Sequence, residues 1–231
     1  DHVAKGFYAN RIGKFMNEGL SPEEEAMAAS VIIEVRDNFG LRACANRGCG
    51  PDQASAVRAD FEALMKVAAT HYGQHRFLLG ERASLGDFTF AGLFKAHVEA
   101  DPEPRSWIDQ CAPEMLGYMN RVFESRTDDA DYLSDDRLPE TLNPFFDHMR
   151  ETYHQFLRVS GEALAANEKW CEVDLGEGPV KMRSLKYSEV SRCHIKNEIE
   201  SLGAEDRAKV DKVLGPLGVL DAYLMPSFLK S

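Results

Sequence analysis

The sequence predicts an all-α fold, a helical bundle with a small β-hairpin near residues 171–183. Apolar residues recur three or four positions apart along most of the chain, and residues that favour helix starts precede several of these stretches. In one short stretch the apolar period changes to two, which is typical of paired strands. With 231 residues, of which 44% are hydrophobic and 28% charged, the chain is long enough to bury a full core.

Two helices are predicted before residue 75. Ser21 can cap a helix that carries Pro22 and acidic residues in its first turn, and Gly48 to Pro51 would end it, so we expect a helix over 22–46. Its apolar positions are Met27, Val31, Val35 and Phe39. A second helix over 52–72 carries one apolar stripe, which we expect to face the helix that starts after residue 84. The stripe consists of Val57, Phe61, Leu64, Ala68 and Tyr72.

A third helix start is encoded by Ser84 and Asp87. The Ser84 hydroxyl can accept from the N–H group three residues on, while the Asp87 carboxylate can reach back to the N–H of Ser84, so both side chains serve the backbone. The residues that follow are unusually apolar and predict a helix driven through the middle of the core. They are Phe88, Phe90, Ala91, Leu93, Phe94 and Val98.

The remaining elements follow from turn residues and from changes of period. Pro113 opens a helix to about residue 125, and the aspartate-rich residues 127–136 predict a solvated linker. Another long helix is expected over 139–169. Two short alternating stretches around a glycine-rich turn predict the hairpin, and two more helices follow, one capped by Ser188 and one over 204–214.

Residues 80–87, Gly-Glu-Arg-Ala-Ser-Leu-Gly-Asp, followed by an apolar helix, resemble the capping-box segment in the C-terminal helical domain of glutathione S-transferases. The segments Asp101-Pro102-Glu103-Pro104, Cys111-Ala112-Pro113-Glu114-Met115 and Met119-Asn120-Arg121-Val122 resemble the loop and helices that come next in that family. The resemblance covers roughly residues 22–126 and is most specific over 77–122.

The resemblance implies a helical domain that binds the hydrophobic substrate, with glutathione as co-substrate and a small hydrophobic electrophile as its partner in the reaction. Arg36 and Phe39 match, by position, the part of the family that lines the substrate pocket, so both are candidate substrate-binding residues. The family's thioredoxin-like half, which activates the glutathione thiol, is not seen; only residues 12–17 resemble its last helix. The catalytic residue is therefore unassigned.

Two functions remain open. The chain is either the substrate-binding helical part of a glutathione S-transferase-like protein, catalytic if a thioredoxin-like half is supplied, or a noncatalytic helical module for dimerisation or complex assembly. Both agree with a homodimer. We divide the chain into residues 1–20, the remnant of a preceding domain, residues 21–137, a transferase-like helical core, and residues 138–231, a helical extension packed on that core.

The composition limits the classes of partner that the chain is expected to bind. The formal charge of −11 opposes binding to nucleic acid and to anionic membrane surfaces. No apolar run reaches the roughly 18 residues that span a bilayer, and residues 1–20 lack the pattern of a signal peptide, so we expect a cytoplasmic protein. Five irregularly spaced cysteines do not form a secreted disulfide framework and are expected to be reduced.

Few residue clusters suggest chemistry of their own. His71 and His75 share a helix face but lack a third metal ligand, and an exposed polar face is the simpler interpretation. His97 is interpreted as a packed core histidine. Cys44 and Cys49 are either small buried residues at a helix end or a redox pair near two arginines. A calcium loop starting at Asp129 lacks ligands at the required positions, and we predict no metal site.

Overall fold

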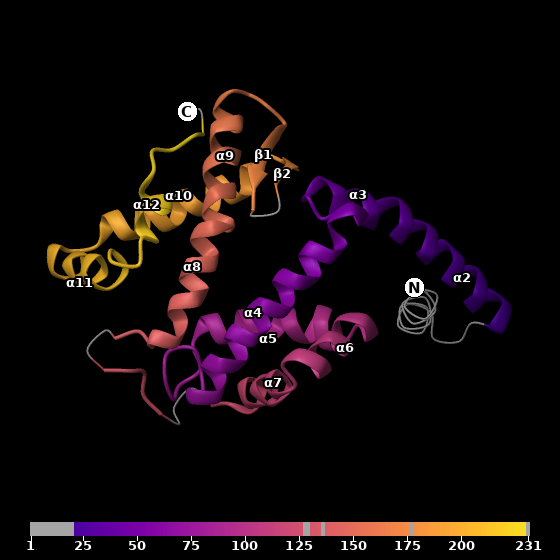
Figure 1. Ribbon diagram of the computed structural model, residues 1–231, viewed down its shortest axis with the longest axis horizontal. Helices are drawn as coiled ribbons and strands as arrows, with labels where there is room; N and C mark the ends of the chain where they lie inside the picture. Colours follow the sequence, from indigo (N-terminus) through magenta and orange to yellow (C-terminus); the bar gives the residue numbers. More distant parts are fainter. Residues whose placement is uncertain (1–20, 127–129, 135–136, 176–177, 230–231) are drawn as a thin grey trace.

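The computed structural model describes residues 21–126, 130–134, 137–175 and 178–229. Within these ranges the chain is mostly helical, and its two strands form one antiparallel hairpin. Figure 1 shows an elongated molecule in which helices α4 to α7 lie together, α8 and α9 run from them toward the hairpin, and α10 to α12 lie beyond. The predicted helical class and the hairpin are confirmed. Residues 1–20 and part of the aspartate-rich linker lie outside the described residues.

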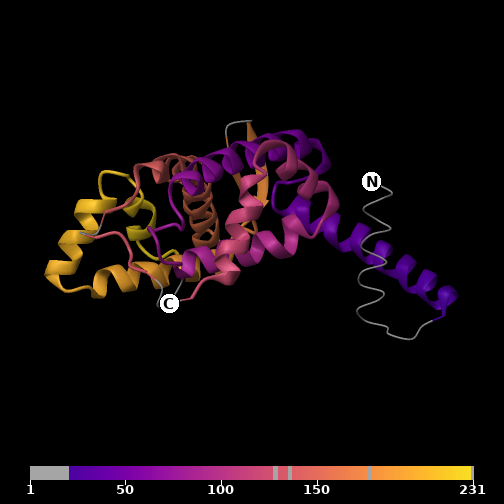
Figure 2. The same ribbon diagram turned by 90° about the horizontal axis from the view of Figure 1, so that it is seen from below.

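The first helices form an arm, defined as residues 22–46, that projects from the rest of the molecule (Figures 1 and 2). It consists of α2 (Pro22–Val35), a π-helical segment η1 (Arg36–Gly40) and α3 (Leu41–Asn46). The Ser21 N–H donates to the Glu24 carboxylate at 2.8 Å, and the Glu24 N–H points back to the Ser21 hydroxyl at 3.4 Å. This reciprocal cap explains the helix start. The predicted extent is confirmed, whereas the π-helical segment was not predicted.

The main core is built by the next four helices. A short 3₁₀ turn, η2 (Pro51–Gln53), leads into α4 (Ala54–Gln74), and α5 (Leu85–Phe94) continues into a second π-helical segment, η3 (Lys95–Glu99). They are followed by α6 (Pro102–Cys111) and α7 (Glu114–Glu124).

Helix α7, and not α5, is the central helix of this core. It contacts both α4 and α5, and four of its side chains, spaced as one helix face, are completely buried. These are Met115, Tyr118, Met119 and Val122. The stripe of α4 was predicted to face the helix after Ser84, but it packs mainly on α6 and α7, and only Tyr72 stacks on Phe90 of α5. Ala68 and Tyr72 are buried, and Val57 at its start is exposed.

The prediction that the helix after Ser84 is buried on all sides is therefore wrong. Asp87, Ala91 and Phe94 of α5 face the core, but Leu85 is 82% exposed and Leu93 60% exposed. Hydrophobic content alone led to the prediction, and it does not show whether another element covers the second face.

The predicted long helix over 139–169 is divided. It consists of the 3₁₀ turn η4 (Glu140–Leu142), α8 (Asn143–Glu151) and α9 (Tyr153–Ala165). Thr152 separates the two helices with backbone angles of φ −115° and ψ −80°, which do not continue an α-helix. The start of this segment meets the main core, because η4 and α8 both contact α4.

The hairpin pairs β1 (Trp170–Asp174) with β2 (Pro179–Arg183), so that Cys171 lies opposite Met182. It packs on α9 in a second apolar cluster around Phe156, Ala163 and Cys171. The chain ends with α10 (Lys186–Ser201), α11 (Ala204–Leu214) and α12 (Leu220–Leu224). Helix α10 begins before Ser188, so the prediction that Ser188 caps it is wrong, while the bounds of α11 are as predicted.

Candidate functional site

The two residues predicted to bind substrate lie in the π-helical segment of the arm. Phe39 is 74% exposed and does not line the cavities beside α11 or the one at Arg150. Arg36 begins the segment, and its side chain lies outside the described residues. The structure therefore places Phe39 on an open helix surface.

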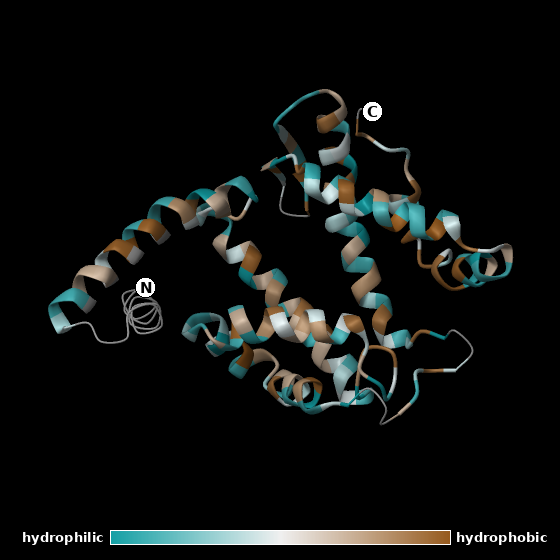
Figure 3. Ribbon diagram, turned by 180° about the vertical axis from the view of Figure 1, so that it is seen from behind, coloured by the Kyte–Doolittle hydropathy of each residue, from teal (hydrophilic) through white to brown (hydrophobic). Residues whose placement is uncertain are grey.

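The arm instead presents a row of exposed apolar side chains, which we call the arm face: Met27, Val31, Val35 and Phe39. Figure 3 shows hydrophobic residues recurring along this projecting helix. Residues four apart on an α-helix drift by about 40° around its axis, which would carry the last of the row away from the first. The wider π-helical turn over Arg36–Gly40 reduces that drift for Phe39. Phe39 therefore lies closer to the side of Met27 than it would on a continuous α-helix.

Cavities among the described residues lie elsewhere. One of about 370 Å³ lies between α11 and the loop before η4 and is lined by leucine and valine side chains with Arg137 and Lys209 among them. A neighbouring cavity of about 320 Å³ shares these two basic residues. Another cavity, of about 310 Å³, is lined by Arg150, Arg158 and His154. Both arginine side chains form hydrogen bonds within the chain. Arg150 donates to Asp147 at 2.6 Å, and Arg158 donates to Gln155 at 2.9 Å.

The predicted cap at Ser84 and Asp87 is confirmed and is part of a larger buried network. One Asp87 oxygen accepts from the Ser84 N–H at 2.8 Å and from the Ser84 hydroxyl at 2.7 Å. The other accepts from the Leu78 N–H at 2.8 Å and from the Tyr118 hydroxyl at 2.9 Å. Both carboxylate oxygens are occupied by donors, so Asp87 is a structural group that has no oxygen left for acid or base chemistry.

Two tyrosines stack beside this carboxylate. The rings of Tyr72 and Tyr118 lie with their centroids 3.6 Å apart, and Phe90 packs against both. Burial raises the pKa of both tyrosines well above the usual range, and the nearby Asp87 charge adds to the shift. Both hydroxyls therefore stay protonated at neutral pH, as a donor to a carboxylate must.

The histidine pair is not the exposed polar face that we predicted. His71 is fully buried, its Nδ1 lies 2.7 Å from the Thr141 hydroxyl, and its ring stacks on His75 at 5.0 Å. Burial, together with the neighbouring His75, lowers the pKa of His71 to about 4. Among the residues that the structure describes, no group of three potential ligands is placed to hold a metal ion.

Two further predictions are corrected. His97, interpreted as a packed core residue, is exposed in η3, because the face of α5 that continues into it is uncovered. Cys44 and Cys49 are both exposed at the end of α3, so the prediction that they are small buried residues is wrong, while the alternative of a redox pair stays a prediction.

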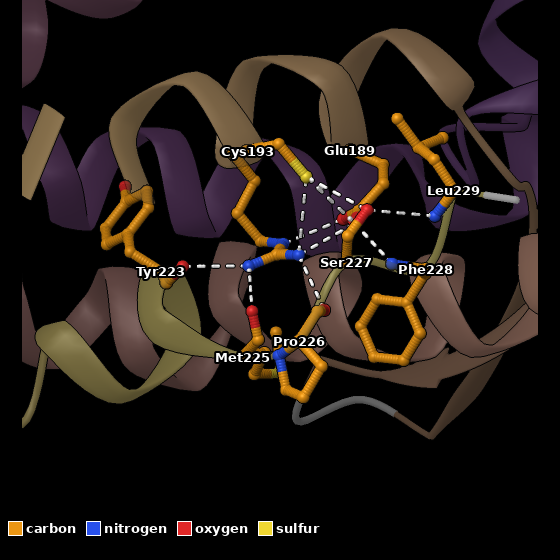
Figure 4. A network of polar contacts seen from close by, with 9 residues as sticks. Glu189, Cys193, Tyr223, Met225, Pro226, Ser227, Phe228 and Leu229 are labelled. Carbon is orange, nitrogen blue, oxygen red and sulfur yellow. Dashed lines mark hydrogen bonds and ion pairs between the residues drawn. The ribbon is translucent and has the colours of Figure 1, made fainter. Parts of the chain in front are cut away.

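A network that the sequence analysis missed ties α10 to the chain end (Figure 4). The buried guanidinium of Arg192 makes two parallel hydrogen bonds to the Glu189 carboxylate, both 2.7 Å long. Its remaining N–H groups donate to the carbonyls of Tyr223, Met225 and Pro226 at 2.8–2.9 Å. Glutamate and arginine three apart on a helix usually form a surface pair, so nothing in the sequence indicated burial.

The carboxylate of this pair also holds the last described residues. The Phe228 N–H donates to Glu189 at 2.9 Å, and the Phe228 ring lies near the Arg192 guanidinium at 5.7 Å. Burial opposes the charged form of Glu189, but the donors from Arg192 and Phe228 outweigh it and hold its pKa below the usual value. The network fixes residues 223–229 against α10.

Comparisons of the chain with protein-family models, with curated proteins and with solved structures give no match. Within the described ranges, the helices are too short or too polar to cross a membrane.

Proposed function

We propose that this chain is a noncatalytic assembly module that forms a homodimer through the arm face. The observation that carries the proposal is the row of four exposed apolar side chains on a helix that projects from the body. Single exposed apolar residues are common on protein surfaces, whereas a contiguous apolar row on one helix face is typical of an interface.

A second uncovered face supplies a surface of the same character. Leu85, Phe88 and Leu93 of α5 are exposed, and a Cβ added at Gly92 between them would meet no other group within 4 Å. In a twofold dimer, the arm of one protomer packs on the α5 face of its partner, and the reverse contact is made at the same time. Each copy thereby covers both of its open faces.

The net charge is consistent with an apolar interface. Two copies that each carry a formal charge of −11 repel one another, so a stable dimer needs contacts that do not depend on charge. We expect added salt to strengthen the dimer by screening this repulsion.

The experiment is sedimentation equilibrium of the whole chain and of two variants, Val31→Glu on the arm and Leu93→Glu on α5. Both should shift the mass toward that of a monomer, because each buries a charge in the proposed contact. Tyr187→Glu is the matched control, since Tyr187 is 82% exposed but lies on α10. A monomeric parent chain, or a dimer that neither variant weakens, would contradict the proposal.

A second candidate function is the substrate-binding helical part of a glutathione S-transferase-like protein. It is supported by the capping box at Ser84 and Asp87, which begins α5 at the position that the resemblance implies. Calorimetric titration with glutathione and with S-hexylglutathione tests it. Saturable binding that Phe39→Ala weakens, and that Phe123→Ala on α7 does not, would favour this function; no heat from either ligand would argue against it.

A further inference from the structure

The end of α3 places Cys44 and Cys49 at the first and sixth positions of a Schellman turn. The Cys49 N–H donates to the Cys44 carbonyl at 2.9 Å, and the Gly48 N–H donates to the Ala45 carbonyl at 3.1 Å. This six-to-one and five-to-two pair of hydrogen bonds defines the motif, and Gly48 adopts the left-handed conformation it requires, with φ +72°. A contact between the first and sixth side chains frequently accompanies this turn.

The hydrogen bond limits how far apart the two cysteines can be. Covalent geometry on either side of the 2.9 Å contact restricts their Cα atoms to a separation of about 6.8 Å or less. Disulfides join Cα atoms that lie about 4.4–6.8 Å apart. The turn therefore holds the two Cα atoms within the range of separations that a disulfide joins.

Exposure distinguishes this pair from the other cysteines. Cys44 and Cys49 are both exposed, whereas Cys171 is buried and Cys111 and Cys193 are half-buried. Partial burial of its sulfur, and then the neighbouring Cys44, raise the pKa of Cys49 above its usual value. The Cys49 thiol also lies 3.5 Å from the Arg47 carbonyl within the same turn.

We propose that Cys44 and Cys49 form a reversible redox site, a dithiol that a low-molecular-weight disulfide of the glutathione type oxidises to an intramolecular disulfide. The thiolate of one cysteine attacks a sulfur of the small disulfide, and one small thiolate leaves. The second cysteine then attacks the mixed disulfide, and the second small thiolate leaves. Each cysteine loses its proton to a departing thiolate, so the two protein thiols are oxidised and one small disulfide is reduced to two thiols.

The site lies where the arm joins the body. A Cβ at Gly48 would lie 2.5 Å from a methyl carbon of Val180 and 3.0 Å from the Met182 side chain, so the turn packs closely on β2. Helix α3 also contacts β2. Oxidation therefore closes a covalent loop at the base of the arm and fixes the turn through which the arm meets the hairpin.

The test equilibrates the folded chain with defined ratios of reduced to oxidised glutathione, quenches with acid and measures intact mass and peptide masses. The parent chain should lose two hydrogens and yield a peptide bridged between Cys44 and Cys49. Cys44→Ser and Cys49→Ser should each trap one glutathione as a mixed disulfide, while Cys111→Ser and Cys193→Ser should behave as the parent chain. Two stable glutathione adducts on the parent, or a bridge that includes another cysteine, would overturn the proposal.

A second measurement distinguishes the effect of the folded turn from the effect of having the two cysteines only five residues apart in the sequence. The titration is repeated in denaturant, where the Schellman hydrogen bonds are lost. The quantity compared is the ratio of reduced to oxidised glutathione at which half of the chain is bridged. We expect this ratio to be about tenfold higher for the folded chain than for the unfolded chain, because the turn holds the thiols together. Equal midpoints in the two states would show that the turn does not favour the bond and would overturn the proposal.

Discussion

The Tyr118 hydroxyl donates to the buried Asp87 carboxylate at 2.9 Å and joins the first turn of α5 to the middle of α7. The same carboxylate holds the Leu78 and Ser84 N–H groups, so the loop before α5, the helix start and the central helix share one acceptor. A motif that the sequence encodes as a local cap is thus also a tertiary contact.

Asp87→Ala should therefore lower the free energy of unfolding by more than the loss of a helix cap alone. Loss of an ordinary cap costs about 0.5–2 kcal/mol, whereas this change also leaves the Tyr118 hydroxyl and two N–H groups without their acceptor. We expect the free energy of unfolding to fall by about 3 kcal/mol or more, against about 1 kcal/mol for Ser84→Ala. Chemical denaturation measures both, with the exposed Glu81→Ala as control. Equal losses for the two variants would show that the network adds nothing to the cap.

His71 should make the protein acid-sensitive. Its pKa of about 4 in the folded chain lies below the usual value near 6.5, so as the pH falls through this window the unfolded chain binds a proton that the folded chain does not. Stability contributed by this group is complete above about pH 6.5 and is lost as the pH falls toward 4, by no more than about 3 kcal/mol.

The measurement is the free energy of unfolding at several pH values for the parent chain and for His71→Gln. The difference between the two should shrink as the pH falls from about 6.5 to about 4. His97→Gln, at an exposed position, should follow the parent curve. A parallel pH dependence in the parent and in His71→Gln would contradict the assigned burial.

Breaking the Glu189 and Arg192 pair should release the chain end. Arg192→Met leaves a buried carboxylate without its main partner, and such a loss costs about 3–5 kcal/mol. Replacing both residues, as Glu189→Leu with Arg192→Met, should cost less than Arg192→Met alone because no charge is left buried. Arg207→Ala removes an exposed pair with Asp211 and should cost less than about 1 kcal/mol. Denaturation, with limited proteolysis of residues 223–229, checks all three.

Glycine-to-alanine substitutions in α4 and in α9 should change the stability of the protein in opposite directions. A Cβ at Gly161 in α9 would lie 2.3 Å from the Phe228 ring, whereas one at Gly73 in α4 would have no neighbour within 4 Å. Gly73→Ala should stabilise the protein by about 0.5–1 kcal/mol, and Gly161→Ala should destabilise it. Thermal denaturation measures both, and Phe228→Ala should relieve the effect of Gly161→Ala. A stabilising Gly161→Ala change would show that Phe228 does not pack there.

Much of the fold could be predicted because the signals are local. The caps at Ser21 and Ser84, the period of two around residues 171–183 and the bounds of α11 all depend on neighbours in the sequence. The break at Thr152 could not be predicted, because periodicity continues across it.

The candidate sites were harder to predict, because burial depends on which elements cover a face. Phe39 and Leu93 look like core residues in the sequence and are exposed, while Arg192 and His71 look like surface residues and are buried. Hydrophobicity does not distinguish a face that packs within the chain from one left open. Open faces of this kind are the basis of the proposed dimer.

Hydrogen exchange of the arm as a function of protein concentration tests the proposed dimer most directly. If the arm face packs on α5 of a second copy, peptides from residues 22–46 should exchange slowly at high concentration and faster on dilution, while the buried face of α7 stays protected throughout. If the arm exchanges at the same fast rate at every concentration, its apolar face is free in solution and the assembly function is wrong.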